Sequence, residues 1–176
     1  EFADKKFEQH NSQLAFDSLA NSDNYTYNGA TGSCKQYFSD QSSGKYIPHF
    51  DVVGPVALPN NMAYYGDDMN REDDRYLFDF ILDACQGADQ LGVDFSNYDN
   101  DNDGFVDFIY VLYAGYGQAD GGEEATIWPH KWDLISVLYF GYHNQSEYFA
   151  NSETDYFLPQ IDGKILNDYA CPSELK

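Results

Sequence analysis

The chain has 176 residues, of which 43% are hydrophobic, and this size and composition fit one globular domain and exclude a disordered chain. Thirty acidic residues against nine basic ones give a formal charge of −21, which argues against nucleic acid and anionic membranes as partners and favours cations. No stretch is apolar enough to predict a membrane span, and the N-terminus carries no signal peptide.

The first third of the chain predicts two short helices followed by an extended segment. NSQLAFDSLANS (11–22) reads as a helix with Ser12 as its N-cap, and GSCKQYFSDQSSGKY (32–46) reads as a second helix that ends near Gly44. KYIPHFDVVGPVALP (45–59) is extended, and its prolines restrict it to an edge strand or a bent strand.

The clearest predicted helix begins near Asn70. Its apolar residues recur at helical spacing and share one face: Leu77, Ile81, Ala84, Cys85 and Ala88. Acidic residues are expected in its first turns, where the helix dipole favours negative charge: Glu72, Asp73 and Asp74. This interpretation explains the acidic cluster without a metal, and it makes Cys85 a buried thiol.

Four later segments predict strands. FVDFIYVLYAG (105–115) is nearly continuous in β-prone residues, as in a strand covered on both faces. ATIWPHKW (125–132) predicts an edge strand because it contains a proline, and SVLYFGY (136–142) and GKILNDYA (163–170) predict two more strands. Helices and strands alternate, which indicates an α/β fold with a mixed, twisted sheet and backing helices.

Three aspartates at alternate positions directly precede the longest of these strands. Asp99, Asp101 and Asp103, followed by Gly104, match the first half of an EF-hand calcium loop, with acids at positions 1, 3 and 5 and glycine at position 6. The same register places the Phe105 carbonyl at position 7 and Asp107 at position 9. The candidate metal ligands are therefore these: Asp99, Asp101, Asp103, Phe105 and Asp107.

The second half of an EF-hand is missing. Position 12 is Tyr110, which has no carboxylate, and a strand follows the loop where an EF-hand has a helix. The remaining oxygens must come from elsewhere, and the acidic candidates are Asp94, Asp120, Glu123 and Glu124. An all-oxygen ligand set favours calcium over zinc, in a structural role, and the alternative is a solvated turn.

No catalytic set is found in the sequence, and no residue is assigned a catalytic role. None of the four histidines has a partner four residues away, no HExxH occurs, and neither a phosphate-binding glycine loop nor a GxSxG motif is present. His130 lies between Pro129 and Trp132, where it either lines a groove or packs as a surface histidine.

Several blocks in order resemble the secreted zinc metallopeptidases of the immune inhibitor A family. These blocks are GSCKQYFSDQSSGKYIPHFDVVGPVALP, AYYGDD, YDNDNDGFVDFIYVLYAGYGQADGG and TIWPHKW, with NDYACPSEL as a later family segment. The resemblance implies a zincin fold, in which a twisted sheet and a backing helix precede an active-site helix carrying HExxH. There two histidines bind zinc and a glutamate activates the zinc-bound water.

The resemblance implies that residues 1–176 form one domain, the N-terminal part of a peptidase domain without its zinc motif. Zinc is expected only in the complete domain, so the chain alone is expected to be inactive. The resemblance carries over the calcium loop, the central strand and an edge strand at the substrate cleft, near which Ile127, Trp128 and His130 are the candidate substrate-binding residues. The alternative for that strand is that it merely closes the sheet.

The expected partners are a peptide or protein substrate and the remainder of the peptidase domain, and the expected location is outside the cell or in the periplasm. A different class of function is a calcium-stabilised extracellular module that binds glycan or protein without catalysis. A dockerin-like module is a third possibility, but it would need two calcium loops on helices, and one such loop is present.

Overall fold

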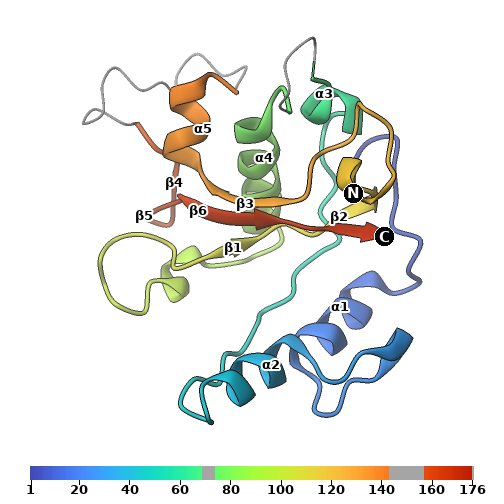
Figure 1. Cartoon of the computed structure of the whole chain (residues 1–176). Helices are drawn as coiled ribbons and strands as arrows, with labels where there is room; N and C mark the ends of the chain where they lie inside the picture. Colours follow the sequence, from blue (N-terminus) through green and yellow to red (C-terminus); the bar gives the residue numbers. More distant parts are fainter. Residues whose placement is uncertain (69–73, 143–156, 176) are drawn as a thin grey trace. The chain divides into compact units, whose positions relative to one another are not determined.

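The computed structural model describes residues 1–68, 74–142 and 157–175 (Figure 1). The chain divides into two compact units, of which the larger contains Glu1–Phe7 and Val56–Lys176 and the smaller contains Glu8–Pro55. Among the described residues, no helix is both long and apolar enough to cross a bilayer.

The smaller unit packs helix α1 (Ser12–Asn21) against helix α2 (Cys34–Gln41), with the short helix η1 (Tyr27–Gly29) between them in the chain. Both helices were predicted. The residue before α1 is Asn11, in a left-handed conformation, so Ser12 is the first helical residue and not the cap that the sequence indicated. Residues 46–55 form no regular strand.

The larger unit contains the mixed sheet that the sequence predicted. Its strands β1 (Ile109–Tyr110), β6 (Asp168–Cys171) and β3 (His130–Asp133) lie in that order, with β1 parallel and β3 antiparallel to β6. Strand β2 (Tyr113–Tyr116) pairs in parallel with β7 (Ser173–Leu175). Strands β4 (Gln160–Ile161) and β5 (Lys164–Ile165) form a hairpin.

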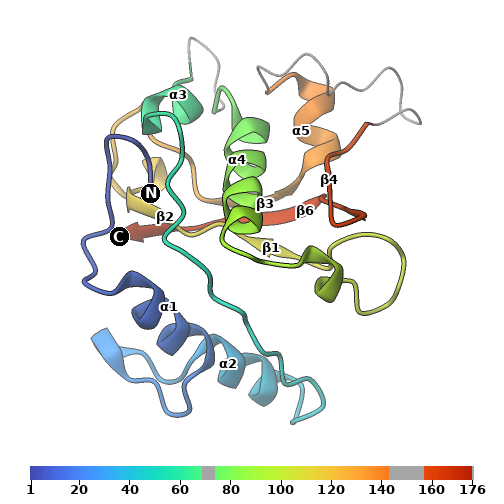
Figure 2. The same cartoon turned by 180° about the vertical axis from the view of Figure 1, so that it is seen from behind.

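Helices cover one face of this sheet. Figures 1 and 2 show α3 (Met62–Gly66), α4 (Leu77–Gln90) and α5 (Leu134–Phe140) on the same side of β1, β6 and β3. The short helices η2 (Phe95–Tyr98) and η3 (Gln118–Asp120) lie in the connections. The α/β class is therefore confirmed.

Helix α4 presents to the core the face that its spacing predicted. Leu77, Ile81 and Cys85 are buried, and Ala84 and Ala88 pack against the same core. Burial raises the pKa of the Cys85 thiol to about 12, so it is an unreactive core side chain, as predicted.

The start of α4 was predicted wrongly. The helix begins at Leu77 with Tyr76 as its cap, so Asp74 precedes the helix and does not lie in its first turn. The Asp74 carboxylate is buried and accepts a hydrogen bond from the backbone of Trp128. Glu72 and Asp73 lie outside the described residues.

Residues 136–142 were expected to form a strand, and this expectation was wrong, because most of them belong to helix α5. Asp133 caps the helix by accepting a hydrogen bond from the Ser136 backbone at 2.8 Å. The buried residues Leu134, Val137 and Leu138 have the i, i+3, i+4 spacing of one helix face. This spacing outweighs the β-propensity of the tyrosine and phenylalanine that follow it.

The predicted strand over 105–115 is divided into β1 and β2. Its parallel partner is divided too, since Pro172 separates β6 from β7 and has no N–H for the ladder. The backbone pairing nevertheless continues across the break, where Val111 donates to Ala170 at 2.9 Å and Tyr113 donates to Pro172 at 3.1 Å. The hydrophobic run thus predicted the course of the chain correctly and missed the interruption.

Candidate metal loop and candidate substrate edge

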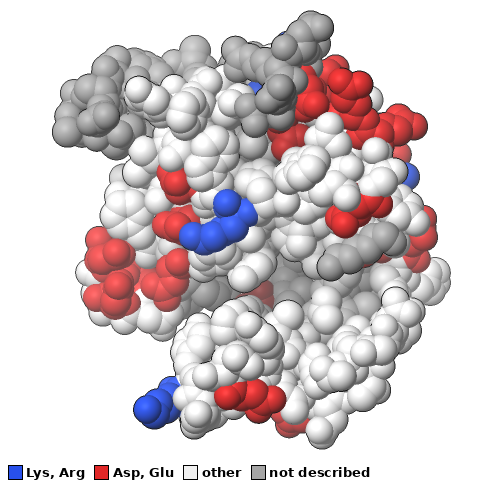
Figure 3. Space-filling model, viewed as in Figure 1, with Lys and Arg blue, Asp and Glu red and all other residues white. Residues whose placement is uncertain are grey.

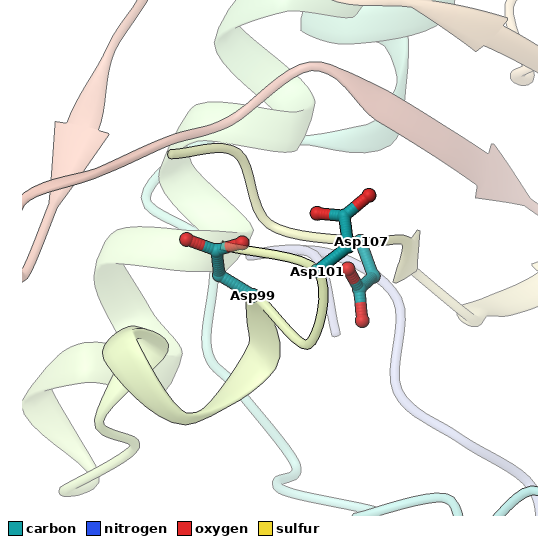
Figure 4. A group of neighbouring side chains, drawn as sticks. All are labelled: Asp99, Asp101 and Asp107. Carbon is teal, nitrogen blue, oxygen red and sulfur yellow. The ribbon is translucent and has the colours of Figure 1, made fainter. Parts of the chain in front are cut away.

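The acidic loop connects η2 to β1, and Figure 4 shows three of its side chains. Asp99, Asp101 and Asp107 each place one carboxylate oxygen within 4.8 Å of the others, and no second group of three such ligands is found among the described residues. Figure 3 shows acidic side chains gathered over this loop. The spacing in the sequence therefore predicted the principal cluster.

Asp99 builds the turn itself. Its Oδ1 accepts a hydrogen bond from the Asp103 backbone at 3.0 Å, and its Oδ2 accepts one from the Gly104 backbone at 3.1 Å. Gly104 has φ of 93°, a left-handed conformation that costs other residues energy. The glycine at position 6 thus has the role that the sequence indicated.

The contacts of Asp103 and Phe105 differ from those of the three converging carboxylates. Asp103 Oδ1 accepts a hydrogen bond from the Phe105 backbone at 2.8 Å, and Asp103 is not among the three converging carboxylates. Phe105 forms an isolated parallel bridge with Ile165. Of the four predicted side-chain ligands, the structure brings three together: Asp99, Asp101 and Asp107.

Sequence reasoning missed Lys164. Its Nζ lies 2.6 Å from Oδ2 of Asp99, whose side chain is 0% exposed. The hydrogen bond from Lys164 holds the pKa of Asp99 below its ordinary value, and the backbone N–H of Gly104 adds to this effect. No local pattern could have indicated a partner 65 positions away.

The additional carboxylates that were considered as ligands have other partners or lie elsewhere. Asp94 caps η2 by accepting from the Ser96 backbone at 3.0 Å, and Asp120 accepts from the Ser173 hydroxyl at 2.8 Å. Neither Glu123 nor Glu124 belongs to the described acidic group. Beside the loop lies an open hollow of about 320 Å³ that is lined by Asp101, Asp103, Phe105, Val106, Asp107, Asn167 and Asp168.

The second candidate site is the segment that leads into β3. The side chain of Ile127 is 0% exposed and packs in the core. Its carbonyl accepts hydrogen bonds from the Tyr113 hydroxyl at 2.7 Å and from the Gln118 backbone at 3.1 Å. Ile127 is one of the three predicted substrate-binding residues, and its side chain points into the core.

Trp128 combines an exposed ring with an occupied backbone. The residue is 53% exposed, but its backbone N–H donates to both oxygens of the buried Asp74 carboxylate at 3.1 and 3.2 Å. Its carbonyl lies 2.6 Å from Nδ1 of His130. Residues 127 and 128 therefore precede the strand and do not belong to it, unlike the prediction for 125–132.

His130 is held by buried neighbours. Because a carbonyl can only accept, Nδ1 carries the proton toward Trp128, and Nε2 accepts from the Tyr169 hydroxyl at 2.8 Å. Burial raises the pKa of Tyr169 well above its ordinary value and that of Cys171 to about 12. This environment matches a packed histidine.

Strand β3 is an edge strand of the three-stranded sheet, as the proline predicted. Leu134 donates to the Asn167 carbonyl at 3.0 Å, which makes these two residues a hydrogen-bonded pair of the antiparallel ladder. Hydrogen-bonded and non-hydrogen-bonded pairs alternate, so the N–H and C=O of Lys131 point away from β6. The same alternation turns the N–H and C=O of Asp133 outward, so Lys131 and Asp133 supply the backbone groups that this edge of β3 presents.

Comparison with known proteins supports the resemblance over most of the chain. A 30% identical relative, immune inhibitor A of Bacillus thuringiensis subsp. alesti, aligns over 120 residues, which cover 57% of this chain and 18% of the relative. The chain thus corresponds to less than a fifth of that protein. The sequence profile described as immune inhibitor A peptidase M6, catalytic domain, matches residues 2–165, and with this match the chain belongs to the immune inhibitor A family of M6 peptidases.

Proposed function

We propose that this chain is part of the catalytic domain of a secreted metallopeptidase and supplies its sheet scaffold, a calcium-stabilised loop and the edge strand beside the substrate. The observation that carries this proposal is the match of the catalytic-domain profile to residues 2–165. The mixed sheet with helices on one face and β3 at its edge is consistent with such a domain.

Peptidases of this family use zinc, and the described residues do not fit a catalytic zinc site. Such a site takes three protein ligands, usually with histidine among them, whereas the converging group here consists of three carboxylates. His130 adjoins Cys171, but the raised pKa of that thiol disfavours the thiolate that zinc requires. We therefore propose that the zinc ligands and the general base are not among the described residues, and we derive no catalytic step here.

The first test is an activity measurement. The purified chain, incubated with denatured casein and zinc, should release no peptides above the level of a matched sample with chelator. A longer protein that adds an HExxH segment should be active under the same conditions. Chelator-sensitive cleavage by the 176-residue chain would contradict the expectation that zinc binds only in the complete domain.

The structural metal of the proposal is calcium at the acidic loop. The three converging groups offer only oxygen, which suits a hard ion of flexible geometry. The loop leads directly into β1, which is parallel to β6, so an ion there would stabilise the entry to the sheet. A ligand that binds the folded state alone adds about 2.7 kcal/mol at a hundred times its dissociation constant.

Thermal unfolding tests the calcium site. Excess calcium should raise the melting temperature relative to chelator at matched ionic strength, and magnesium should substitute poorly because it demands tighter octahedral geometry. Asp101→Asn with Asp107→Asn should abolish this response. The matched control, Glu123→Gln with Glu124→Gln, removes the same amount of charge and should retain it. Equal melting temperatures in calcium and chelator would make the loop a solvated turn.

The edge of β3 is the proposed position of the peptide substrate. An extended peptide can add to a free strand edge through backbone hydrogen bonds, and Lys131 offers an outward N–H and C=O. The exposed ring of Trp128 would flank the peptide, with His130 behind it. The alternative is that β3 only closes the sheet.

Crosslinking tests this position. A substrate-like inhibitor with a photoreactive group should label residues 128–133 in the longer, active peptidase, and an excess of unlabelled inhibitor should suppress the labelling. Labels that fall consistently on other segments would favour the alternative.

A further inference from the structure

Lys164 brings a positive charge to the acidic loop from a distant part of the chain. Its Nζ lies 2.6 Å from Oδ2 of Asp99, and its side chain is 24% exposed whereas that of Asp99 is fully buried. We propose that Lys164 is a built-in counter-ion that competes with calcium for Asp99 and thereby sets the calcium affinity of the loop. This inference rests on the calcium site proposed above.

The lysine is positioned by the β4–β5 hairpin, which is hydrogen-bonded to the start of η2 before the loop and to Gly104 and Val106 within the loop. At the hairpin turn, Asp162 accepts a hydrogen bond from the Phe95 backbone at 2.9 Å. The next residue after Lys164, Ile165, donates to the Gly104 carbonyl and accepts from the Val106 backbone, each at 2.9 Å. The hairpin therefore holds the lysine backbone against the loop, and the ammonium group reaches Asp99 as a consequence.

Competition follows from the contacts of Asp99. Its Oδ1 accepts from the Asp103 backbone, and its Oδ2 accepts from both Gly104 and Lys164. A carboxylate oxygen has about two lone-pair positions, so the contacts already present use those of Oδ2. A calcium ion that binds Oδ2 must displace the ammonium group, and an ion that binds only the other oxygens still meets a positive charge nearby.

The same contact gives the buried carboxylate of Asp99 a counter-charge. A buried carboxylate without a partner is costly, and Lys164 supplies that partner. The acidic residues at the loop surface, Asp101 and Asp107, are exposed and have no ion pair with a described basic residue. An arriving ion would thus gain Asp101 and Asp107 and exchange with Lys164 at Asp99.

Calorimetric titration with calcium chloride tests the proposal on the whole chain. Lys164→Met removes the charge and keeps a long side chain, and it should bind calcium about tenfold more tightly or better, since ligand charge sets the affinity of such loops. Lys164→Arg keeps the charge and should bind as the unmodified chain does. In chelator, Lys164→Met should have a lower melting temperature than the unmodified chain. Added calcium should raise the melting temperature of Lys164→Met by more than it raises that of the unmodified chain.

The outcomes separate this inference from the calcium site itself. Tighter binding by Lys164→Met, or binding by that variant alone, supports competition. Equal or weaker binding by Lys164→Met than by the unmodified chain overturns competition and leaves the calcium site standing. Binding by neither protein overturns both.

A measurement on the unmodified sequence is needed in case Lys164→Met does not fold. Reductive ¹³C-methylation labels lysines and keeps their charge, and Lys164→Arg identifies the Lys164 resonance. Calcium should move that resonance to the position of exposed lysines, and magnesium at the same ionic strength should not. A resonance that stays in place while calcium binds overturns the proposal.

Discussion

The acidic loop and the segment before β3 differ in what holds them. In the loop, the side chains that shape the turn are two to five residues from the backbone groups they bind, as with Asp99 and Gly104. In the segment around Trp128, the partners come from far along the chain, with Asp74 54 positions away and Tyr169 39 positions from His130.

This difference decides which backbone groups remain available. The loop has the conformation that its residue spacing predicts, because aspartate and glycine act locally. The segment from Ile127 to Trp128 has the composition of an edge strand, but the side chains of Tyr113, Asp74 and His130 occupy the Ile127 carbonyl and the N–H and carbonyl of Trp128. The first backbone groups of β3 that point away from β6 are therefore those of Lys131.

The largest expected effect compares two neighbouring residues of the edge segment. Ile127→Ala should lower the free energy of unfolding by about 2–5 kcal/mol, because it leaves a cavity in the core. Trp128→Ala, at a ring that is 53% exposed, should cost much less. Denaturant unfolding measures both. Similar losses for the two variants would show that Trp128 is also part of the packed core.

The next effect concerns the distant anchor of the same segment. Asp74→Ala should cost about 1–3 kcal/mol, since the N–H of Trp128 loses its acceptor in a buried position. Asp74→Asn retains an acceptor oxygen and should cost less. Unfolding in denaturant gives the values, and hydrogen exchange at the Trp128 amide should accelerate in Asp74→Ala. An unchanged exchange rate would contradict the anchoring role.

A smaller effect is expected at Gly104, where the constraint is the backbone conformation of a single residue. Gly104→Ala should cost about 1–2 kcal/mol through the left-handed backbone alone, because no atom lies within 4 Å of the added methyl group. Gly104→Asn should cost less, since asparagine tolerates this conformation. Chelator is used in both measurements of unfolding. A loss as large as that of Ile127→Ala would mean that the left-handed backbone of Gly104 is not the whole cause.

The smallest effect is a difference in pH dependence between the regions. The folded-state pKa of Asp99 is lowered by Lys164, so its contribution is present at neutral pH and is lost as the pH falls through that value. Burial raises the pKa of Tyr113, so the unfolded chain releases that proton more easily and stability falls as the pH rises above about 10.

Thermal unfolding across pH, in chelator, measures this difference. Asp99→Asn should flatten the acid side of the profile and Tyr113→Phe the alkaline side. If either substitution changed the opposite side instead, the assignment of the two pH dependences to these regions would be wrong.

Several features of this protein were determined by the sequence over short distances. The α/β class, the helical face of Leu77, Ile81 and Cys85 and the turn at Gly104 all follow from periodicity or from residue types with strict backbone preferences. Helix α5 was missed although its apolar residues have helical spacing. Its seven residues are also β-prone, and so short a stretch fits a strand as well as a helix. Short elements are ambiguous when only local preference is considered.

Tertiary structure alone decided the partners. That Lys164 meets Asp99, that Asp74 binds the Trp128 backbone and that Ile127 turns inward depend on contacts between residues 39 to 65 positions apart or on burial in the shared core. Such pairings are set by how the hairpin, the helices and the sheet pack together. A hydrogen bond or an ion pair needs two groups within about 3–4 Å, and sequence spacing carries that information only within a single turn, helix or strand.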